Sequence, residues 1–363
     1  MKVTSSTPEA TMKAMQVHEF LDLWGQDEKT AESNLRMNDV APKPTALKKQ
    51  QLLIKVLACS ISPGDVIMAQ GNMLIMRQPF PFVPGMDVCG AIVDSNGSIE
   101  YQNGNVIVAS NGMTPIGGMA EYMIVDEAEA TLKPADVSNE EGASCSSAAT
   151  ARNAVMDHVT EGDRVLILGG SGGVGSAAIQ IAKAHAKASL VVATSTQFDL
   201  CRELGADRVI DYRSEDWWTN EEYKKDKFDV IIDTVGGGNF YGRATEVLKT
   251  GKAGGTFVAV TGDDPRPDCT TMWKTLKFFA KLPRKPLYTQ LRSGTYPKYV
   301  LLMPYDEAKG RKQVLGWMQE GSLKIQLDDE SPLPFTAEGV RSAFLKVGSG
   351  HAHGKVVVQI AKE

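Results

Sequence analysis

The chain has 363 residues, of which 42% are hydrophobic, enough for about two domains with complete cores. Its 39 basic and 44 acidic residues give a formal charge of -5, so no overall positive field exists and nucleic acid is excluded as a main partner. No apolar run approaches the roughly 18 residues that a membrane span needs. Five scattered cysteines indicate reduced thiols, and the first 11 residues lack the arginine or apolar core of a targeting segment. We therefore expect a cytoplasmic protein.

The first third of the chain has the pattern of a β-rich domain. Short apolar runs separated by Gly and Pro predict strands at 52–58, 88–93, 105–109 and 120–125. An alanine-rich helical stretch follows at 136–160 and ends at a Glu-Gly-Asp turn. We place the domain boundary near this turn.

Strands and helices alternate in the next part of the chain. Strands are predicted at 164–168, 190–194, 208–211, 228–233 and 255–260, and helices at 174–185, 198–204 and 240–248. This alternation predicts an α/β fold with a parallel, doubly wound sheet. The tail is expected to contain helices 306–319 and 337–346, a strand-like run 323–327 and a final strand 355–360.

A glycine-rich loop lies between the first strand and helix of this second domain. Residues 169–175 read GGSGGVG, in which Gly170, Gly172 and Gly175 satisfy the pattern G-x-G-x-x-G. One match is a weak signal, but here it follows an apolar strand and opens a helix, as the motif requires. Without a Cβ the loop can turn tightly and approach a pyrophosphate, whose charge is met by amides at the helix N-terminus. The loop thus predicts a dinucleotide site, the alternative being a turn without a ligand.

The end of the second strand of this domain favours NADP(H) over NAD(H). NAD-preferring folds place an acidic residue there, whereas this chain has Thr-Ser-Thr-Gln at 194–197. Neutral side chains do not repel a 2′-phosphate, although this turn contains no Arg or Lys to pair with it. Tyr212, after the third strand, is either a donor to that phosphate or to the adenosine, or an aromatic packed at a strand end.

Several motifs in order carry a family resemblance. They are MKAMQV, PFVPGMDVCGAIV, GGMAEYMIV, VLILGGSGGVGSAAIQIAK, ELGADRVIDY, FDVIIDTVGG and AFLKVGSGHAHGKVVV. The chain resembles the zinc-free medium-chain dehydrogenases/reductases of the quinone oxidoreductase, or zeta-crystallin, type, and its last motif is most similar to the reticulon-interacting NADPH oxidoreductase branch. The resemblance implies a GroES-like β-rich domain formed by residues 12–150 and 304–363, with a Rossmann domain at 151–303 inserted between them.

The resemblance also implies which residues bind NADPH. The matching positions are Ser171, Gly173 and Val174 at the pyrophosphate, Thr194 and Tyr212 at the adenosine phosphate, and Thr234, Gly236, His351, Ala352 and His353 along the cofactor. The two histidines come from the other domain, in a cleft where pockets tend to form. Their alternative interpretation is that of polar surface residues on a turn.

The residues that bind zinc in related enzymes are absent from the sequence. Ser62 stands where zinc relatives have Cys, Met86 stands where they have His, and no closely spaced run of four Cys is present. His351 and His353 alone fall short of the three or four ligands that zinc takes. We therefore expect metal-free hydride transfer to a quinone or an α,β-unsaturated carbonyl, in which charge moves onto an oxygen that hydrogen bonds can hold.

The proton donor of such a reaction is not obvious from the sequence. Many relatives carry a Tyr two residues after the Asp of an N-P-x-D segment, but here Asp65 is followed by Val66 and Ile67. Ser62 is then the candidate for binding the substrate carbonyl, with solvent as the alternative proton source. Two other functions stay open: enoyl-thioester reduction, with the basic stretch 281–292 binding coenzyme A phosphates, and a non-catalytic NADPH-binding or interaction protein.

One segment is unusually basic. Between residues 269 and 305 there is no acid but seven Lys and Arg, and apolar residues recur at helical spacing from Trp273 on. A basic amphipathic helix within 273–298 is typical of peripheral contact with an anionic membrane, where lipophilic quinones reside. The alternative is an interdomain or homodimer contact that buries the apolar face.

Overall fold

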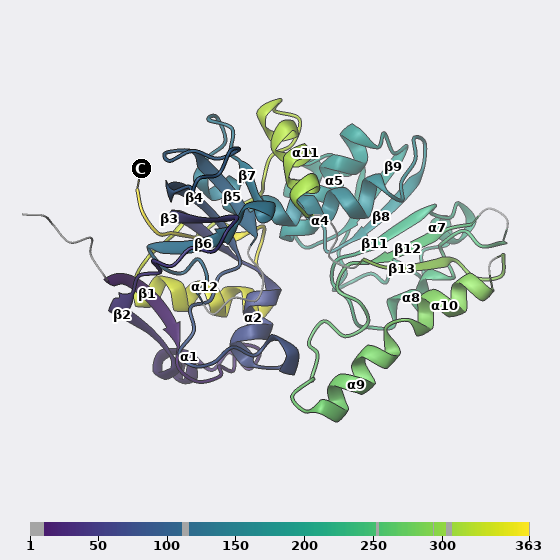
Figure 1. Ribbon diagram of the computed structural model, residues 1–363. Helices are drawn as coiled ribbons and strands as arrows, with labels where there is room; N and C mark the ends of the chain where they lie inside the picture. The colour runs from purple at the N-terminus through teal and green to yellow at the C-terminus, as the bar shows by residue number, and fades with distance from the viewer. Residues whose placement is uncertain (1–10, 111–115, 252–253, 293, 303–306, 363) are drawn as a thin grey trace, which may run out of the picture.

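The computed structural model describes residues 11–110, 116–251, 254–292, 294–302 and 307–362, which form two lobes side by side (Figure 1). Residues 1–10, on which the targeting expectation depends, lie outside these ranges. No helix of the described residues is long and apolar enough to cross a membrane.

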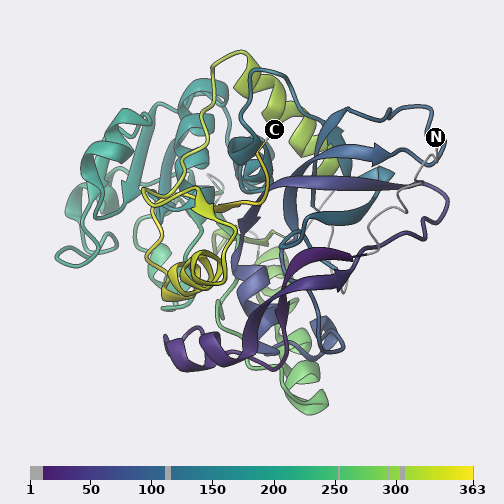
Figure 2. The ribbon, with the colours of Figure 1, turned by 90° about the vertical axis from the view of Figure 1, so that its left-hand side faces the viewer.

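The β-rich lobe is organised around one long strand, β3 (Gln51–Ile61). It pairs antiparallel with β4 (Asp87–Asp94), β6 (Tyr122–Asp126) and the C-terminal strand β15 (Val356–Gln359). The last strand of the chain thereby completes the sheet of the first lobe, as the yellow tail in Figure 2 shows. The other strands of this lobe are β1 (Thr11–Val17), β2 (Leu35–Pro42), β5 (Val106–Ser110), β7 (Ala130–Leu132) and β14 (Leu333–Pro334).

The helices of this lobe pack against its strands and against one another. They are α1 (Glu28–Asn34), α2 (Pro63–Gln70), the 3-10 turns η1 (Leu74–Met76) and η2 (Glu127–Glu129), α3 (Asn139–Ala143) and α12 (Ala337–Ser349). α12 is capped by Thr336, whose side chain accepts from the Gly339 amide, and it buries Val340 and Phe344 at helical spacing. It ends at Gly350, whose φ of 77° stops the helix.

The second lobe contains a six-stranded, fully parallel sheet in the order β10-β9-β8-β11-β12-β13. Its strands are β8 (Arg164–Leu168), β9 (Leu190–Thr194), β10 (Arg208–Ile210), β11 (Val230–Asp233), β12 (Thr256–Ala259) and β13 (Lys298–Leu301). The helices around it are α4 (Cys145–Met156), α5 (Gly173–Gln180) continued by η3 (Ile181–His185), α6 (Phe198–Glu203), α7 (Glu221–Lys225) and α8 (Phe240–Ala244). α11 (Glu307–Gln319) packs against α4 and also contacts β7 of the first lobe. The predicted fold class, a β-rich lobe with a doubly wound parallel sheet, is confirmed.

Two strand expectations differ from the structure. β13 was not predicted, although Tyr299, Val300 and Leu301 form a short apolar run, because it directly follows the basic segment for which the pattern predicts a helix. The run 323–327 forms no strand: only Leu327 makes an isolated bridge, with Lys355. Leu323 and Ile325 bury their side chains in the core without a strand partner, which explains the apolar alternation in the sequence.

The basic segment forms two helices, α9 (Met272–Lys281) and α10 (Arg284–Leu291), before β13. The expectation that an interdomain contact buries the apolar face of this helix is wrong, because Trp273 is 66% exposed and Leu276 55% exposed. α9 instead projects from the bottom of the molecule in Figure 1.

The sheet order determines where a ligand is expected. The chain enters the sheet at β8 and places β9 on one side of it and β11 on the other, so the strand order reverses at β8. Ligands of open parallel sheets bind at the carboxyl ends of the strands at such a switch point. The glycine loop follows β8 directly and lies at this point.

Candidate cofactor and substrate site

The glycine loop is held against the end of the neighbouring strand. The amide of Gly169 donates to Thr194 Oγ1 at 3.0 Å and that of Gly170 to the Thr194 carbonyl at 2.9 Å. Gly172 then caps α5, which begins at Gly173. Since the first amides of a helix have no intrahelical partner, they form a group of donors beside the ends of β8 and β9. Ser171, Gly173 and Val174 all belong to this turn.

The three motif glycines have different roles in the turn. A Cβ on Gly175 would lie 2.1 Å from the Gly169 carbonyl oxygen, and one on Gly170 would lie 2.7 Å from Ala193 Cβ, so packing of the loop requires both glycines. A Cβ on Gly172 would meet only the Gly169 oxygen, at 3.5 Å, and its φ of -75° suits any residue. Packing within the protein therefore does not require a glycine at position 172, whereas the close approach of a ligand to the backbone would require one.

The C-terminal tail crosses to this loop from the other lobe. Gly354 makes a parallel bridge with Gly172, which brings His353 to the turn after β9. There His353 Nε2 lies 3.2 Å from Gln197 Nε2, while its Nδ1 is buried without a hydrogen-bond partner among the described residues. An unpaired buried ring nitrogen is costly unless a ligand completes it. His351 is exposed, and Ala352 between them is half-buried.

The remaining predicted cofactor residues occupy the same edge of the sheet. Thr234 follows β11, and its hydroxyl donates to the Leu168 carbonyl at 2.7 Å. Gly236 has a φ of 76°, and its amide donates to buried Asp233, whose pKa is raised to about 6 by burial. Tyr212 follows β10 and is 52% exposed. The structure thus brings all of these positions to the carboxyl ends of adjacent strands.

Lys355, which directly follows Gly354, was assigned no role from the sequence. Its side chain is buried: a Cβ on Gly173 would lie 2.8 Å from Lys355 Cδ, so the lysine stem covers the start of α5. Its ammonium donates to the Ile61 carbonyl at 3.3 Å and lies 3.8 Å from Asp87 Oδ2. A lysine next to the bridging glycine was the only signal in the sequence.

Ser62 is held by a buried carboxylate at the end of β3. Asp65 Oδ2 accepts from the Ser62 amide at 2.8 Å and from its hydroxyl at 2.9 Å. Asp65 Oδ1 accepts from the amides of Gly85 and Met86 at 3.1 and 3.0 Å. Burial, and after it the charge of Asp87, raises the pKa of Asp65 to about 6. The carboxyl therefore changes its protonation state close to neutral pH, next to the half-buried Ser62 hydroxyl.

The donor set at this point does not suit zinc. Ser62 Oγ and the Met86 side chain flank Gly64, and neither a serine hydroxyl nor a thioether is among the ligands that zinc prefers. Burial raises the pKa of the Cys145 thiol to about 12, which keeps it protonated. Among the described residues no group of three or more His, Cys, Asp or Glu could hold a metal ion.

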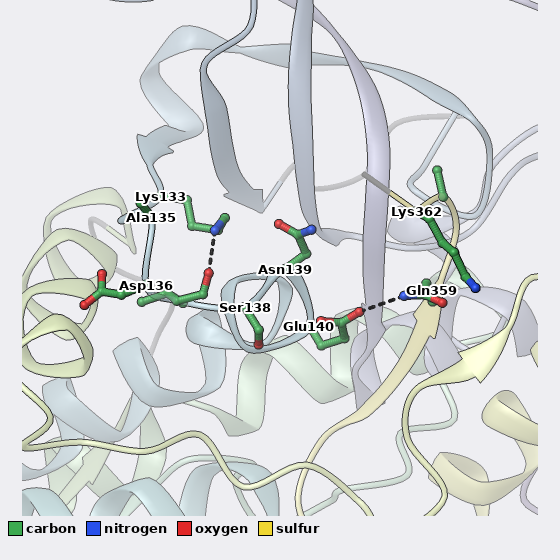
Figure 3. A pocket seen from close by; sticks show the side chains of 10 residues that line it. Lys133, Ala135, Asp136, Ser138, Asn139, Glu140, Gln359 and Lys362 are labelled. Carbon is green, nitrogen blue, oxygen red and sulfur yellow. Dashed lines mark hydrogen bonds between the residues drawn. The ribbon is translucent and has the colours of Figure 1, made fainter.

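Two surface hollows lie elsewhere in the molecule. The one in Figure 3 is lined mainly by the loop before α3 and by the end of β15, and Gln359 Nε2 donates there to Glu140 Oε1 at 3.3 Å. The other lies between η3, α6 and the segment before β14. Neither includes a glycine-loop residue. The candidate site therefore depends on the convergence of the glycine loop, the tail and α2.

Comparison with known proteins matches both parts of the chain. Residues 48–135 match the family described as "Alcohol dehydrogenase GroES-like domain", and residues 204–358 match that described as "Zinc-binding dehydrogenase". The chain is 32% identical to the chloroplastic NADPH-dependent alkenal/one oxidoreductase of Arabidopsis thaliana, over 95% of this chain and 80% of the relative. It is 29% identical to the mitochondrial NAD(P)H oxidoreductase RTN4IP1 of Danio rerio, over 94% of this chain and 91% of the relative. Its fold is that of the quinone oxidoreductase from Coxiella burnetii, with a TM-score of 0.75 and 24% identity over 96% and 99% of the two chains.

Proposed function

Because this chain belongs to the zinc-free quinone oxidoreductase family of the medium-chain dehydrogenases/reductases, we propose that it reduces quinones or α,β-unsaturated carbonyl compounds with NADPH. The proposal is carried by two features that the Gly172–Gly354 bridge brings together. One is Gly172, where a Cβ would have room, and the other is His353 Nδ1, which is buried and has no hydrogen-bond partner in the part of the chain that the structure describes. A relative of which this chain covers four fifths is itself named as an NADPH-dependent alkenal/one oxidoreductase.

Different residues at the carboxyl edge of the sheet bind different parts of the cofactor. The diphosphate is bound by amides of the turn Ser171, Gly173 and Val174, because a helix N-terminus favours negative charge. The 2′-phosphate lies at the end of β9, beside Thr194, Tyr212 and His353, where the turn 194–197 itself carries no acidic side chain. Thr234 and Gly236, with the tail residues His351 and Ala352, line the remaining length.

Bound NADPH supplies the hydride, and the chain supplies orientation and hydrogen bonds. We assign Ser62 to the substrate oxygen. While Asp65 is ionised, it accepts a hydrogen bond from the Ser62 hydroxyl. Once protonated, it can donate a hydrogen bond to Ser62 Oγ, which frees the hydroxyl to donate to a carbonyl. A carboxyl with a pKa of about 6 is suited to supply such a proton near neutral pH.

A direct test is to mix the protein with NADPH and follow its fluorescence, then its oxidation with panels of quinones, enones and enoyl thioesters. We expect the protein to bind NADPH and to oxidise it in the presence of quinones or enones. Binding without turnover of any compound would instead support the non-catalytic function.

Turnover of enoyl thioesters alone would support the thioester reductase. That alternative would place the coenzyme A phosphates on Lys281, Arg284 and Arg292, which are exposed to solvent.

We also propose a homodimer and a reducing compartment. β13 is the edge of the parallel sheet, and Leu287 and Leu291 of neighbouring α10 are 56% and 75% exposed, which suits pairing with a second copy. Sedimentation velocity tests the dimer: a monomer at all concentrations would contradict it.

The cysteines indicate the compartment. All five are free and buried, which fits the cytosol.

A further inference from the structure

The helix α9 is held to the molecule along only one narrow face. Of its ten residues, all of which the structure describes, Thr275 alone is buried. Thr275 Oγ1 donates to the Cys269 carbonyl at 3.0 Å and thereby fixes the start of the helix. Met272 is 63%, Trp273 66%, Leu276 55% and Phe279 39% exposed. A soluble protein rarely leaves so many large apolar side chains together in water without a use for them.

The side chains of α9 fall into three sectors of its circumference. With 3.6 residues per turn, Met272, Leu276, Phe279 and Trp273 share about one third of the circle, all of it exposed. Lys274, Lys277 and Lys281 occupy the adjacent sector, and Thr275 with half-buried Phe278 faces the protein. An apolar strip bordered by lysines is the arrangement of a helix that lies in a membrane interface.

The charges next to this strip are mostly uncompensated. Lys274 pairs with Asp268 at 2.6 Å, and Lys285 of α10 pairs with Asp263 at 2.6 Å. Lys277, Lys281 and Arg284 have no ion pair within the part of the chain that the structure describes. No acid lies between residues 269 and 305, so this surface is positive although the whole chain is negative. Anionic lipid attracts such a surface.

We propose that α9 docks the protein on an anionic lipid bilayer, with Trp273, Leu276 and Phe279 inserted at the level of the headgroups and the lysines at the phosphates. A second copy of the chain is a poorer occupant of the α9 strip, because two α9 faces would oppose each other with like charge, and the homodimer proposed above pairs through β13 and α10 instead. The lipid surface instead complements both the apolar strip and the cations.

The docking helix is connected to the proposed substrate region. The Cys269 amide donates to the Asn72 carbonyl at 2.7 Å, and the Leu74 amide donates to the Cys269 carbonyl at 3.0 Å. These bonds join the start of α9 to the loop after α2, the helix that Ser62 and Asp65 open. This part of the inference rests on the proposed function: a lipophilic quinone or enone would enter from the membrane beside this loop.

Co-sedimentation with vesicles tests the docking without any substrate. The full chain is mixed with vesicles of phosphatidylcholine alone and of phosphatidylcholine with phosphatidylserine. We expect binding to the mixed vesicles and a loss of at least about tenfold in partitioning for Lys277→Glu/Lys281→Glu/Arg284→Glu, because each basic residue contributes electrostatic attraction. The matched control Lys48→Glu/Lys49→Glu/Lys225→Glu changes the same charge at exposed sites elsewhere and should bind like the unaltered protein.

Trp273 reports whether the apolar strip inserts. Its fluorescence should shift to the blue with mixed vesicles, and the shift should be lost in Trp273→Phe. Equal binding to both kinds of vesicle, or none, would overturn the proposal. So would a dimer that dissociates in Trp273→Ser/Phe279→Ser, because the strip would then bind a second copy. Turnover of a water-soluble enone by these variants tests the proposed function separately, since it should be unchanged whichever result the vesicles give.

Discussion

Replacing Gly172 by alanine should weaken NADPH binding without harming the fold. The new Cβ would meet only the Gly169 carbonyl oxygen, at 3.5 Å, an ordinary contact, and the backbone at Gly172 is not left-handed. The methyl group would instead occupy the side from which the diphosphate approaches. Losing one charge-assisted hydrogen bond costs about 1.5–3 kcal/mol, so the dissociation constant should rise about 10- to 150-fold.

Two matched variants make this result specific. Gly175→Ala places a Cβ 2.1 Å from a backbone oxygen of the loop itself, so it should reduce both stability and binding. Gly316→Ala, in α11, meets nothing within 4 Å and should leave binding unchanged while stabilising the fold by about 0.5–1 kcal/mol. Titration calorimetry and thermal unfolding measure both quantities. Unchanged NADPH affinity in Gly172→Ala would refute the assignment of the loop.

Three further variants test other parts of the site. His353→Ala should weaken the binding of NADPH about tenfold and that of NADH much less, because the ring lies at the turn after β9. Calorimetry with both cofactors measures the two affinities, and an equal loss for both would contradict this placement of the ring. Ser62→Ala should reduce kcat about 10- to 100-fold at an unchanged NADPH dissociation constant, which steady-state kinetics would check. Asp65 has a folded pKa raised above the unfolded value, so its contribution to stability is present below about pH 4 and is lost as pH rises through about 6. The free energy of unfolding of the unaltered protein relative to Asp65→Asn should therefore fall by about 2–3 kcal/mol between pH 4 and 7.5, and denaturant titrations that show no such fall would contradict the raised pKa.

The parallel-sheet lobe could be read from the sequence because local pattern determines it. β8 and β9 are buried on both faces and appear as continuous apolar runs, and the glycine loop between β8 and α5 has a motif with its own physical reason. β13 was missed because its short apolar run directly follows the basic segment for which the pattern predicts a helix, and its pairing with β12 at the sheet edge is a long-range contact.

The candidate site was only partly accessible to sequence reasoning. The resemblance gave His353, but its pairing with Gln197 depends on a crossing between residues 156 positions apart. Asp65 was noted only for the absent tyrosine after it, and its burial and four donors arise from two separate loops. Lys355 was marked in the sequence only by its place after Gly354, since the burial of a lysine next to a helix N-terminus is a product of how the lobes meet. Long-range contacts of this kind have no local pattern in the chain.

A structure of the protein with NADPH bound would test the central claim most directly. We expect the diphosphate against the amides at the start of α5 beside Gly172, and the 2′-phosphate within hydrogen-bond distance of His353 at the turn after β9. A cofactor bound elsewhere, or a Gly172 turn that stays free of the dinucleotide at saturating NADPH, would contradict the account.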